Sequence, residues 1–124
     1  MEKFEVNILG CGSALPTTRH FASSQVVNIR EKLFMIDCGE GAQIQLRSAR
    51  ISFQKIEHIC LSHIHGDHIF GIFGLLSTMG MLGRSSVLNI YAPKSFRPIL
   101  DFFMTHFGEG VKYEINFVEL EMAE

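Results

Sequence analysis

The segment Ser62–His68 constrains this chain more than any other part of its sequence. Within six positions it places four side chains of metal-binding type, namely His63, His65, Asp67 and His68. The apolar run 56–61 before it is predicted to be a strand, and the apolar run 69–82 after it a buried helix. This strand–loop–helix order puts the cluster at the C-terminal end of a strand, where α/β proteins build their sites.

The spacing within the cluster predicts two adjacent metal sites. His63 and His65 are two residues apart, so an extended segment points both the same way. Gly66 permits a sharp turn, after which Asp67 and His68 face a second position. Imidazole and carboxylate ligands suit zinc, and two such ions activate water for attack at phosphorus. Asp67 is then also the expected proton acceptor. The alternative is a polar surface loop whose histidines are coincidental.

Residues outside the cluster are weaker candidates. His58 lies within a predicted strand, His106 lies near the end of a predicted helix and His20 lies in an early loop, and all three are expected to be structural. Asp37 precedes a glycine-flanked turn. It is either structural or a support for a metal-bound histidine, and both readings stay open. Substrate-binding residues are not identified.

The periodicity along the chain predicts an α/β protein, with strands first and then strands alternating with helices. The predicted strands are 3–9, 25–30, 32–37, 56–61, 87–92 and 113–120, with a tight hairpin at Arg30–Glu31. A short helix is expected over 41–48 and an amphipathic helix with one apolar face over 96–107. Residues 62–68 are expected to form a loop.

Composition limits the possible classes of protein. A chain of 124 residues is expected to be one domain. Its 47% hydrophobic content and 11 Phe suggest apolar surface meant for a partner or for a missing part of the fold. No apolar stretch has the length of a membrane span and the N-terminus lacks a signal peptide, so a cytoplasmic protein without membrane contact is expected. The three cysteines form no disulfide framework and are expected to be reduced and buried.

Three segments together carry a family resemblance. Ser62–Gly71 resembles the Thr/Ser-His-x-His-x-Asp-His motif of the metallo-β-lactamase superfamily. Asp37–Gln45 resembles the Asp-Cys-Gly-Glu-Gly-Thr-Gln segment of ribonuclease Z, the tRNA 3′ endonuclease, and Leu9–Arg19 resembles the opening loop of that family. Two departures, Ala42 in place of Thr and His20 in place of Asn, remove no metal ligand but would alter contacts near the site.

The resemblance implies a fold of two β-sheets between layers of helices, with this chain as the N-terminal half of that αββα fold and a mixed sheet with flanking helices. It implies that His63 and His65 bind a first zinc ion and that Asp67 and His68 bind a second, while Asp67 also accepts a proton. It implies precursor tRNA as the partner and cleavage just after the discriminator base. A homodimer is expected as well.

The resemblance also implies a longer protein. Residues 1–124 are then a single, truncated domain, with the remaining zinc ligands and a basic tRNA-binding arm supplied by sequence that is not present. The net charge of −2 fits an arm outside this segment and argues mildly against RNA binding by the segment alone. The fragment by itself is expected to be inactive and to self-associate through an uncovered sheet face. The alternatives are another hydrolase of the same fold, acting on a thioester or phosphodiester, and a non-catalytic half-domain.

Overall fold

A six-stranded mixed sheet with helices on one side organises the computed structural model, which describes residues 4–10 and 24–121. The strands lie in sequence order, and they are β1 Phe4–Gly10, β2 Ser24–Ile29, β3 Lys32–Cys38, β4 Ile56–Cys60, β5 Leu88–Pro93 and β6 Ile115–Leu120. The helices are α1 Ala42–Ser48, α2 Gly66–Ile69, α3 Ile72–Met81 and α4 Phe96–Phe107, with 3₁₀ turns at Phe53–Lys55 and Gly108–Gly110. The mixed sheet with flanking helices is confirmed.

The first half of the sheet is antiparallel and the second half is parallel. β1, β2 and β3 pair antiparallel, and the β2–β3 turn consists of Arg30 and Glu31, with φ angles of 53° and 66°. The Asn28 side chain closes this turn by accepting a hydrogen bond from the backbone N–H of Glu31 at 2.9 Å. From β3 onward each strand runs parallel to the next, because a helical crossover separates them.

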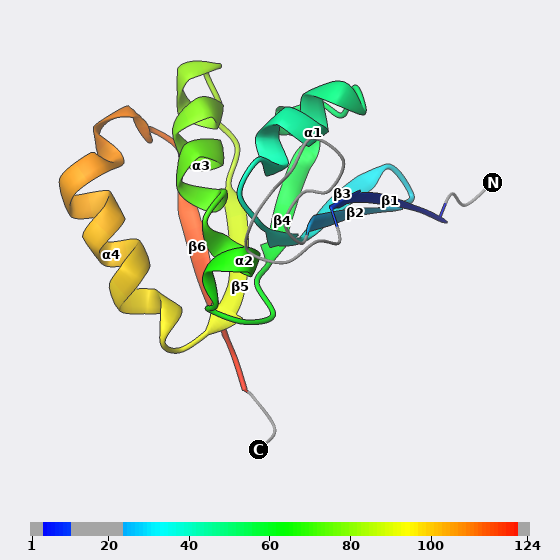
Figure 1. Cartoon of the computed structure of the whole chain (residues 1–124). Coiled ribbons are helices and arrows are strands. Elements are labelled where there is room, and N and C mark those ends of the chain that lie inside the picture. The colour runs from blue at the N-terminus through cyan, green and yellow to red at the C-terminus, as the bar shows by residue number, and fades with distance from the viewer. Residues whose placement is uncertain (1–3, 11–23, 122–124) are drawn as a thin grey trace.

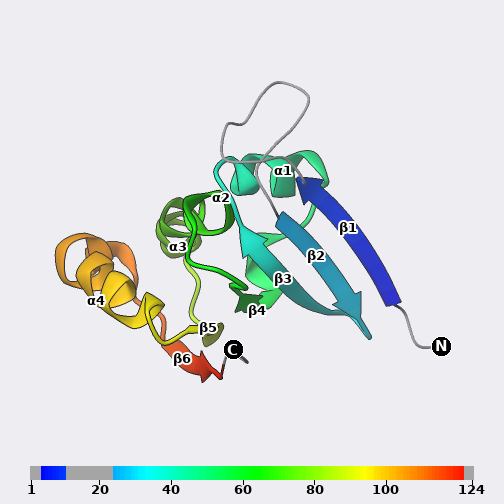
Figure 2. The same cartoon turned by 60° about the horizontal axis from the view of Figure 1, so that its bottom comes forward.

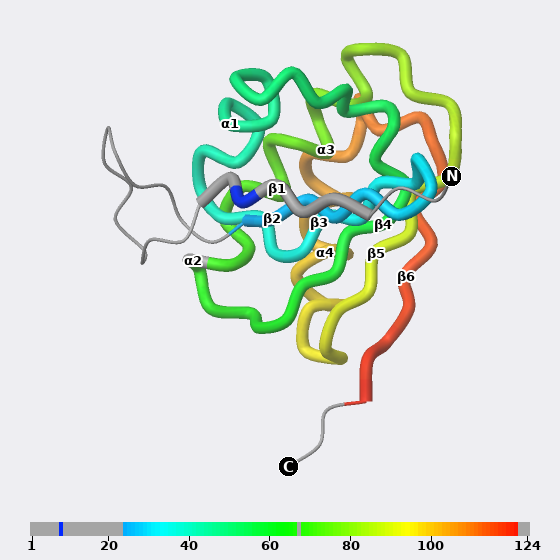
Figure 3. The backbone as a smooth tube through the Cα atoms, turned by 90° about the vertical axis from the view of Figure 1, so that its right-hand side faces the viewer, coloured from blue at the N-terminus to red at the C-terminus, as the bar shows by residue number. Residues whose placement is uncertain are grey.

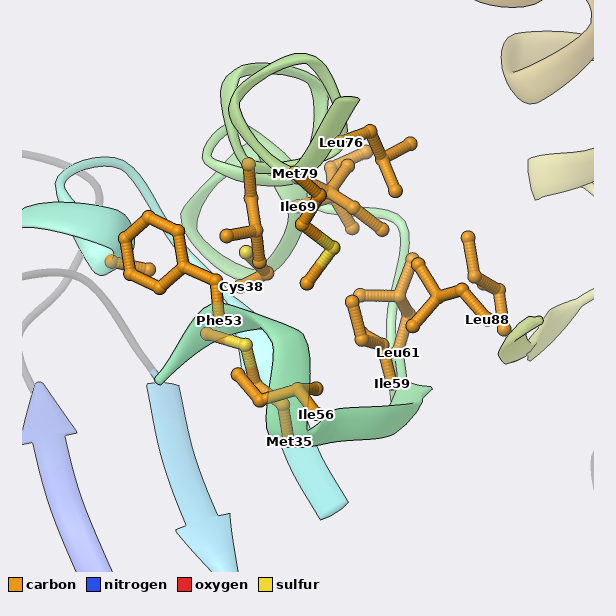
Figure 4. Close-up of a cluster of buried hydrophobic side chains, with 14 of the residues drawn as sticks. Met35, Cys38, Phe53, Ile56, Ile59, Leu61, Ile69, Leu76, Met79 and Leu88 are labelled. Carbon is orange, nitrogen blue, oxygen red and sulfur yellow. The ribbon is translucent and has the colours of Figure 1, made fainter. Parts of the chain in front are cut away.

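The helices cover one face of the sheet (Figures 1 and 2). Alternate strand residues are buried beneath them, as the burial patterns of β2, β3 and β5 show. Figure 4 shows the centre of this layer, where side chains from β3, β4 and β5 meet those of α2 and α3: Met35, Ile56, Ile59, Leu88, Ile69, Leu76 and Met79. This core sets the position of the strand ends that carry the site.

The opposite face carries the half-buried members of the same strands. Phe34 stacks on His58 with ring centroids 4.5 Å apart, and the Tyr91 hydroxyl lies 2.8 Å from His58 Nδ1. His58 is therefore a structural residue within the sheet, as expected. No helix of the described residues covers this face in Figure 2.

The region after β4 differs from the sequence-based expectation. Residues 62–68 were expected to be a loop, but α2 already begins at Gly66. The single buried helix expected over 69–82 is wrong, because the helix is interrupted between Ile69 and Ile72 and its far end, at Met81 and Leu82, is exposed. The interruption coincides with Gly71, whose N–H donates to the carbonyl of Cys38 at 2.9 Å and so does not continue α2.

None of the helices within residues 4–10 and 24–121 combines the length and the apolar composition of a membrane-spanning helix.

Candidate metal centre

The parallel pairing of β3 and β4 brings two strand ends together. Ile36 is the register partner of Cys60, so Asp37 on β3 lies beside the chain that leaves β4 at Leu61 and Ser62. The chain then turns back into α2, as the tube in Figure 3 shows. The cluster therefore lies at the C-terminal ends of parallel strands, as the strand–loop–helix order predicted.

Asp37 lies beneath the cluster as a buried carboxylate, and its side chain is only 8% exposed. Its φ angle of 60° is unusual for a residue other than glycine and turns the chain at the end of β3. Asp37 Oδ1 accepts hydrogen bonds from the backbone N–H and the hydroxyl of Ser62, both at 2.8 Å. Because the strained residue is tied to Ser62 in this way, the carboxylate has a defined position below the histidines.

The same carboxylate orients two of the three histidines. Asp37 Oδ2 lies 2.7 Å from His68 Nδ1, which donates to it when the proton is on that nitrogen. The Ser62 hydroxyl donates its one proton to Asp37, so it accepts from His63 Nδ1 at 2.9 Å. Both histidines thus carry their proton on Nδ1, and Nε2 is the nitrogen that would bind a metal.

The three imidazoles lie close to one another. The ring centroids of His63 and His65 are 5.9 Å apart and nearly parallel, and those of His63 and His68 are 4.8 Å apart. The side chain of Asp67 lies outside the described part, so its predicted role as ligand and proton acceptor stays a prediction. Among the described side chains, no three His, Cys, Asp or Glu residues enclose a common metal position. The donor set nevertheless fits a metal, because the buried carboxylate sets the tautomer of two neighbouring histidines.

Close backbone contact holds α2 and α3 against the end of β3. A side chain at Gly71 would collide with the carbonyl oxygen of Gly39, so glycine is required at this position. Further along α3, the Thr78 hydroxyl donates a hydrogen bond to Gln43 of α1 at 2.7 Å. Gln43 thus joins two helices and contacts neither His63 nor His68 in the described hydrogen bonds.

The cysteines near the cluster are structural. Cys38 is free and buried, and burial, with a smaller contribution from the Asp37 charge, raises the pKa of its thiol far above the ordinary value. The pKa of Cys60 is raised by the same two causes in the same order. A protonated thiol is a poor nucleophile. The expectation of burial is confirmed for Cys38 and is wrong for Cys60, which is only half-buried. Cys11 and His20 lie outside the described residues, and His106 contacts Phe102 on α4, with ring centroids 4.4 Å apart.

Comparison with known proteins places the chain in a family. A family model described as "Anti-Pycsar protein Apyc1" matches residues 4–110. The chain belongs to this family. Among curated proteins, it is 58% identical over 124 residues to a protein named Ribonuclease Z from Bacteroides thetaiotaomicron and 57% identical over 121 residues to one from Parabacteroides distasonis. The resemblance to ribonuclease Z is therefore confirmed.

Solved structures support the same grouping. The human tRNase Z, short form, superposes with a TM-score of 0.86 at 30% identity, covering 99% of this chain and 47% of the human one. A metallo-β-lactamase fold protein from Bacillus subtilis, at 20% identity and a TM-score of 0.70, shares the fold. This fold implies dependence on metal. The chain covers 39% of the Bacteroides thetaiotaomicron relative and 38% of the Parabacteroides distasonis one.

Proposed function

We propose that this chain is part of a zinc-dependent endoribonuclease that removes 3′ trailers from precursor tRNA. One observation carries the proposal: a single buried carboxylate, Asp37, orients His63 through Ser62 and His68 directly. That arrangement occurs in a chain whose relatives are named Ribonuclease Z. The hydrogen bonds with Asp37 and Ser62 engage Nδ1 of His68 and His63 and leave Nε2 available to bind a metal rather than to act in general acid–base catalysis.

The proposed roles follow the predicted ligand set. His63 and His65 would hold a first zinc ion, and Asp67 and His68 a second. Zinc bound there would supply an activated water and stabilise the charge that develops on the phosphate oxygens. Asp67 would accept the proton from the attacking water, while Asp37 and Ser62 keep the imidazoles in the metal-binding tautomer.

Substitution of a ligand in the whole protein tests this assignment. His63→Ala and Asp67→Asn are each expected to lower the rate of precursor tRNA cleavage by at least about 1,000-fold, because each removes part of a cooperating unit. Bound zinc should fall in parallel when it is measured by mass spectrometry of the metal. His106→Ala, on α4, is the matched control and should retain zinc and activity. Normal cleavage by either ligand variant would contradict the proposal.

A second candidate is another hydrolase of the same fold, acting on a thioester or a different phosphodiester. The family model supports this second candidate, because its description, Anti-Pycsar protein Apyc1, differs from the name Ribonuclease Z of the curated relatives. Parallel assays of the whole protein on precursor tRNA and on a thioester would decide. Efficient turnover of the thioester with no cleavage of tRNA would replace the first candidate.

The 124-residue chain alone is proposed to be inactive. Its cluster offers four candidate ligands, and a pair of zinc ions takes three or four protein ligands each. Calorimetric titration of the isolated chain with zinc should therefore show weak binding, and tight binding of two ions would reject the idea. The chain as a single, truncated domain remains a prediction.

We further propose that the whole protein is a homodimer that works in the cytoplasm. An apolar groove between α3 and α4 supports self-association, because it is lined by Phe73 and Phe103 and bordered by Phe102 and Phe107, which are 62% and 65% exposed. Phe102→Asp should convert the dimer to a monomer in light scattering, and a wild-type monomer would refute the assembly. Recovery of the protein in a membrane fraction would refute the location.

A further inference from the structure

Phe70 is a large apolar side chain in an unusual place. It follows α2 directly, two residues after His68, and it is 63% exposed. Its backbone N–H donates to the carbonyl of Gly66 at 3.0 Å, which fixes the residue at the end of the short helix. The exposed ring is therefore held by the same turn that carries the candidate metal ligands.

The Phe70 ring lies directly on Gly66. A Cβ at Gly66 would collide with three atoms of the ring, so a larger residue there would displace Phe70. Gly66 separates His65 from Asp67, and the ring thus contacts the backbone between two candidate ligands. One side of the ring is supported by the metal-binding loop, and the rest of the ring is open to solvent.

A groove of about 370 Å³ begins at this ring. Phe70, Gly71 and Gly74 form one wall, and residues 40–44 form the other, including Ile44, which is 59% exposed. The volume lies within the range of small-molecule sites, roughly 300–1,000 Å³. The Glu40 carboxylate at the groove disfavours a phosphate and can accept a hydrogen bond from an amino group. The groove is thus suited to a flat base with an exocyclic amine and not to the phosphate backbone.

We propose that Phe70 is a stacking platform for an unpaired base next to the cleaved phosphodiester, with the base held between the ring and the α1 side of the groove. The proposal rests on the function proposed above and adds the contact that would position the strand over the metal loop. Aromatic side chains bind unpaired RNA bases by stacking, and loss of one such contact weakens binding by about 5- to 150-fold. Phe70 is a positioning residue, because it contacts the substrate base and not the reacting phosphate.

A double-mutant cycle on the whole, zinc-loaded protein tests the contact. Phe70→Leu keeps an apolar side chain against Gly66 but removes the ring, and Phe70→Tyr keeps the ring. The substrates are precursor tRNA and two versions with an abasic residue immediately before or immediately after the cleaved bond. Phe70→Leu should raise KM for unmodified RNA by about 5- to 150-fold with a smaller change in kcat. For the substrate that lacks the stacked base, Phe70→Leu should leave KM unchanged, because the contact is already lost. Phe70→Tyr and the exposed control Met81→Ala should behave as wild type.

A binding measurement on the wild type keeps the proposal testable even if a variant fails to fold. Precursor RNA that carries a non-hydrolysable methylenephosphonate at the cleaved bond and 2-aminopurine at either position, bound to the whole, zinc-loaded protein, should lose fluorescence as the base stacks. If the effect of Phe70→Leu on KM simply added to the effect of each abasic substitution, the stacking role would be overturned. Absence of quenching at both positions would also overturn it. In either case, cleavage of unmodified RNA by the wild type would leave the proposed function intact. No cleavage of unmodified RNA by the wild type would overturn both, and is a separate readout.

Discussion

Two buried charges, Asp37 and Arg84, serve the molecule in different ways although they are almost equally buried, at 6% and 5% exposure. Asp37 bonds to the side chains of Ser62 and His68, which belong to the candidate metal centre. Arg84, just after α3, donates instead to backbone carbonyls, with Ser86 and Val87 at 3.1 Å. Burial of a charge by itself therefore does not identify a functional site.

The partners of each charge explain the difference. Backbone carbonyls have no alternative protonation state, so Arg84 can only join the segments that meet around it, which include the turn Phe53–Lys55 and the ring of Tyr113 at 5.6 Å. Burial lowers the pKa of Arg84, and Tyr113 and Glu57 oppose that shift. Imidazoles have two tautomers, so a carboxylate bonded to them selects the nitrogen that faces the metal. Substitutions at the two charges should accordingly affect different properties.

Removal of Arg84 should have the largest effect on stability. Arg84→Met leaves several buried carbonyls without a donor, and we expect the whole protein to lose about 3 kcal/mol of unfolding free energy. Urea unfolding measures this loss, and zinc affinity should change little. If Arg84→Met weakened zinc binding as much as a substitution at Asp37, the contrast between the two charges would be broken.

Replacement of Asp37 should act mainly on metal binding. Asp37→Asn can place an amide N–H against the Nδ1–H of His68, which disfavours the required tautomer, and we expect zinc to bind about 10- to 100-fold more weakly. Competition with a chelator on the whole protein measures the affinity. The exposed Asp101→Asn is the matched control. A large loss of folding stability with unchanged zinc affinity would make Asp37 a structural charge like Arg84.

Tyr113 lies beside Arg84 and helps to join the same segments of the chain. Its hydroxyl donates to the carbonyl of Leu76 at 2.7 Å, so Tyr113→Phe should cost about 1 kcal/mol. Burial raises the pKa of Tyr113 to about 12, against an opposing effect of Arg84, from an ordinary value of 10.0. The unfolded chain therefore ionises first, and the contribution of Tyr113, complete below pH 10, is lost as the pH rises to about 12. The difference between wild type and Tyr113→Phe in urea unfolding should shrink over that range, and a constant difference would contradict it.

An exposed charge pair gives the smallest expected effect. Arg97 lies 3.2 Å from Asp101 one turn along α4, and both side chains are more than half exposed. Asp101→Asn should change the unfolding free energy by no more than about 0.5 kcal/mol and less at high salt. A loss of more than 1 kcal/mol in urea unfolding would show that this exposed pair contributes to the unfolding free energy as a buried charge does.

The candidate site was only partly predictable from the sequence. The motif named His63, His65, Asp67 and His68, because metal-type side chains at short spacing are visible in one dimension. It left two readings open for Asp37, which precedes the motif by 25 residues and reaches Ser62 only through parallel pairing of β3 and β4. The motif predicted no role for Ser62, because a hydroxyl that hydrogen-bonds to both a carboxylate and an imidazole can be recognised only from the folded geometry.

The fold shows the same division. Periodicity of two predicted the strands, and the apolar spacing from Phe96 predicted α4, because these patterns reflect local backbone geometry. The break between α2 and α3 was not predicted. It depends on the contact of Gly71 with the backbone of Cys38 and Gly39, which is distant in the sequence.

Most strands and helices of this protein, and the kinds of ligand in its cluster, could be predicted from the sequence alone, because both depend on neighbours along the chain. The roles of the two buried charges, one orienting histidines and the other joining backbone segments, became visible only in the folded protein, because the partners of Asp37 and Arg84 come from other strands and turns. It also decided that the Phe70 ring rests on Gly66 at the rim of a groove, since the opposite wall of that groove is formed by a distant segment.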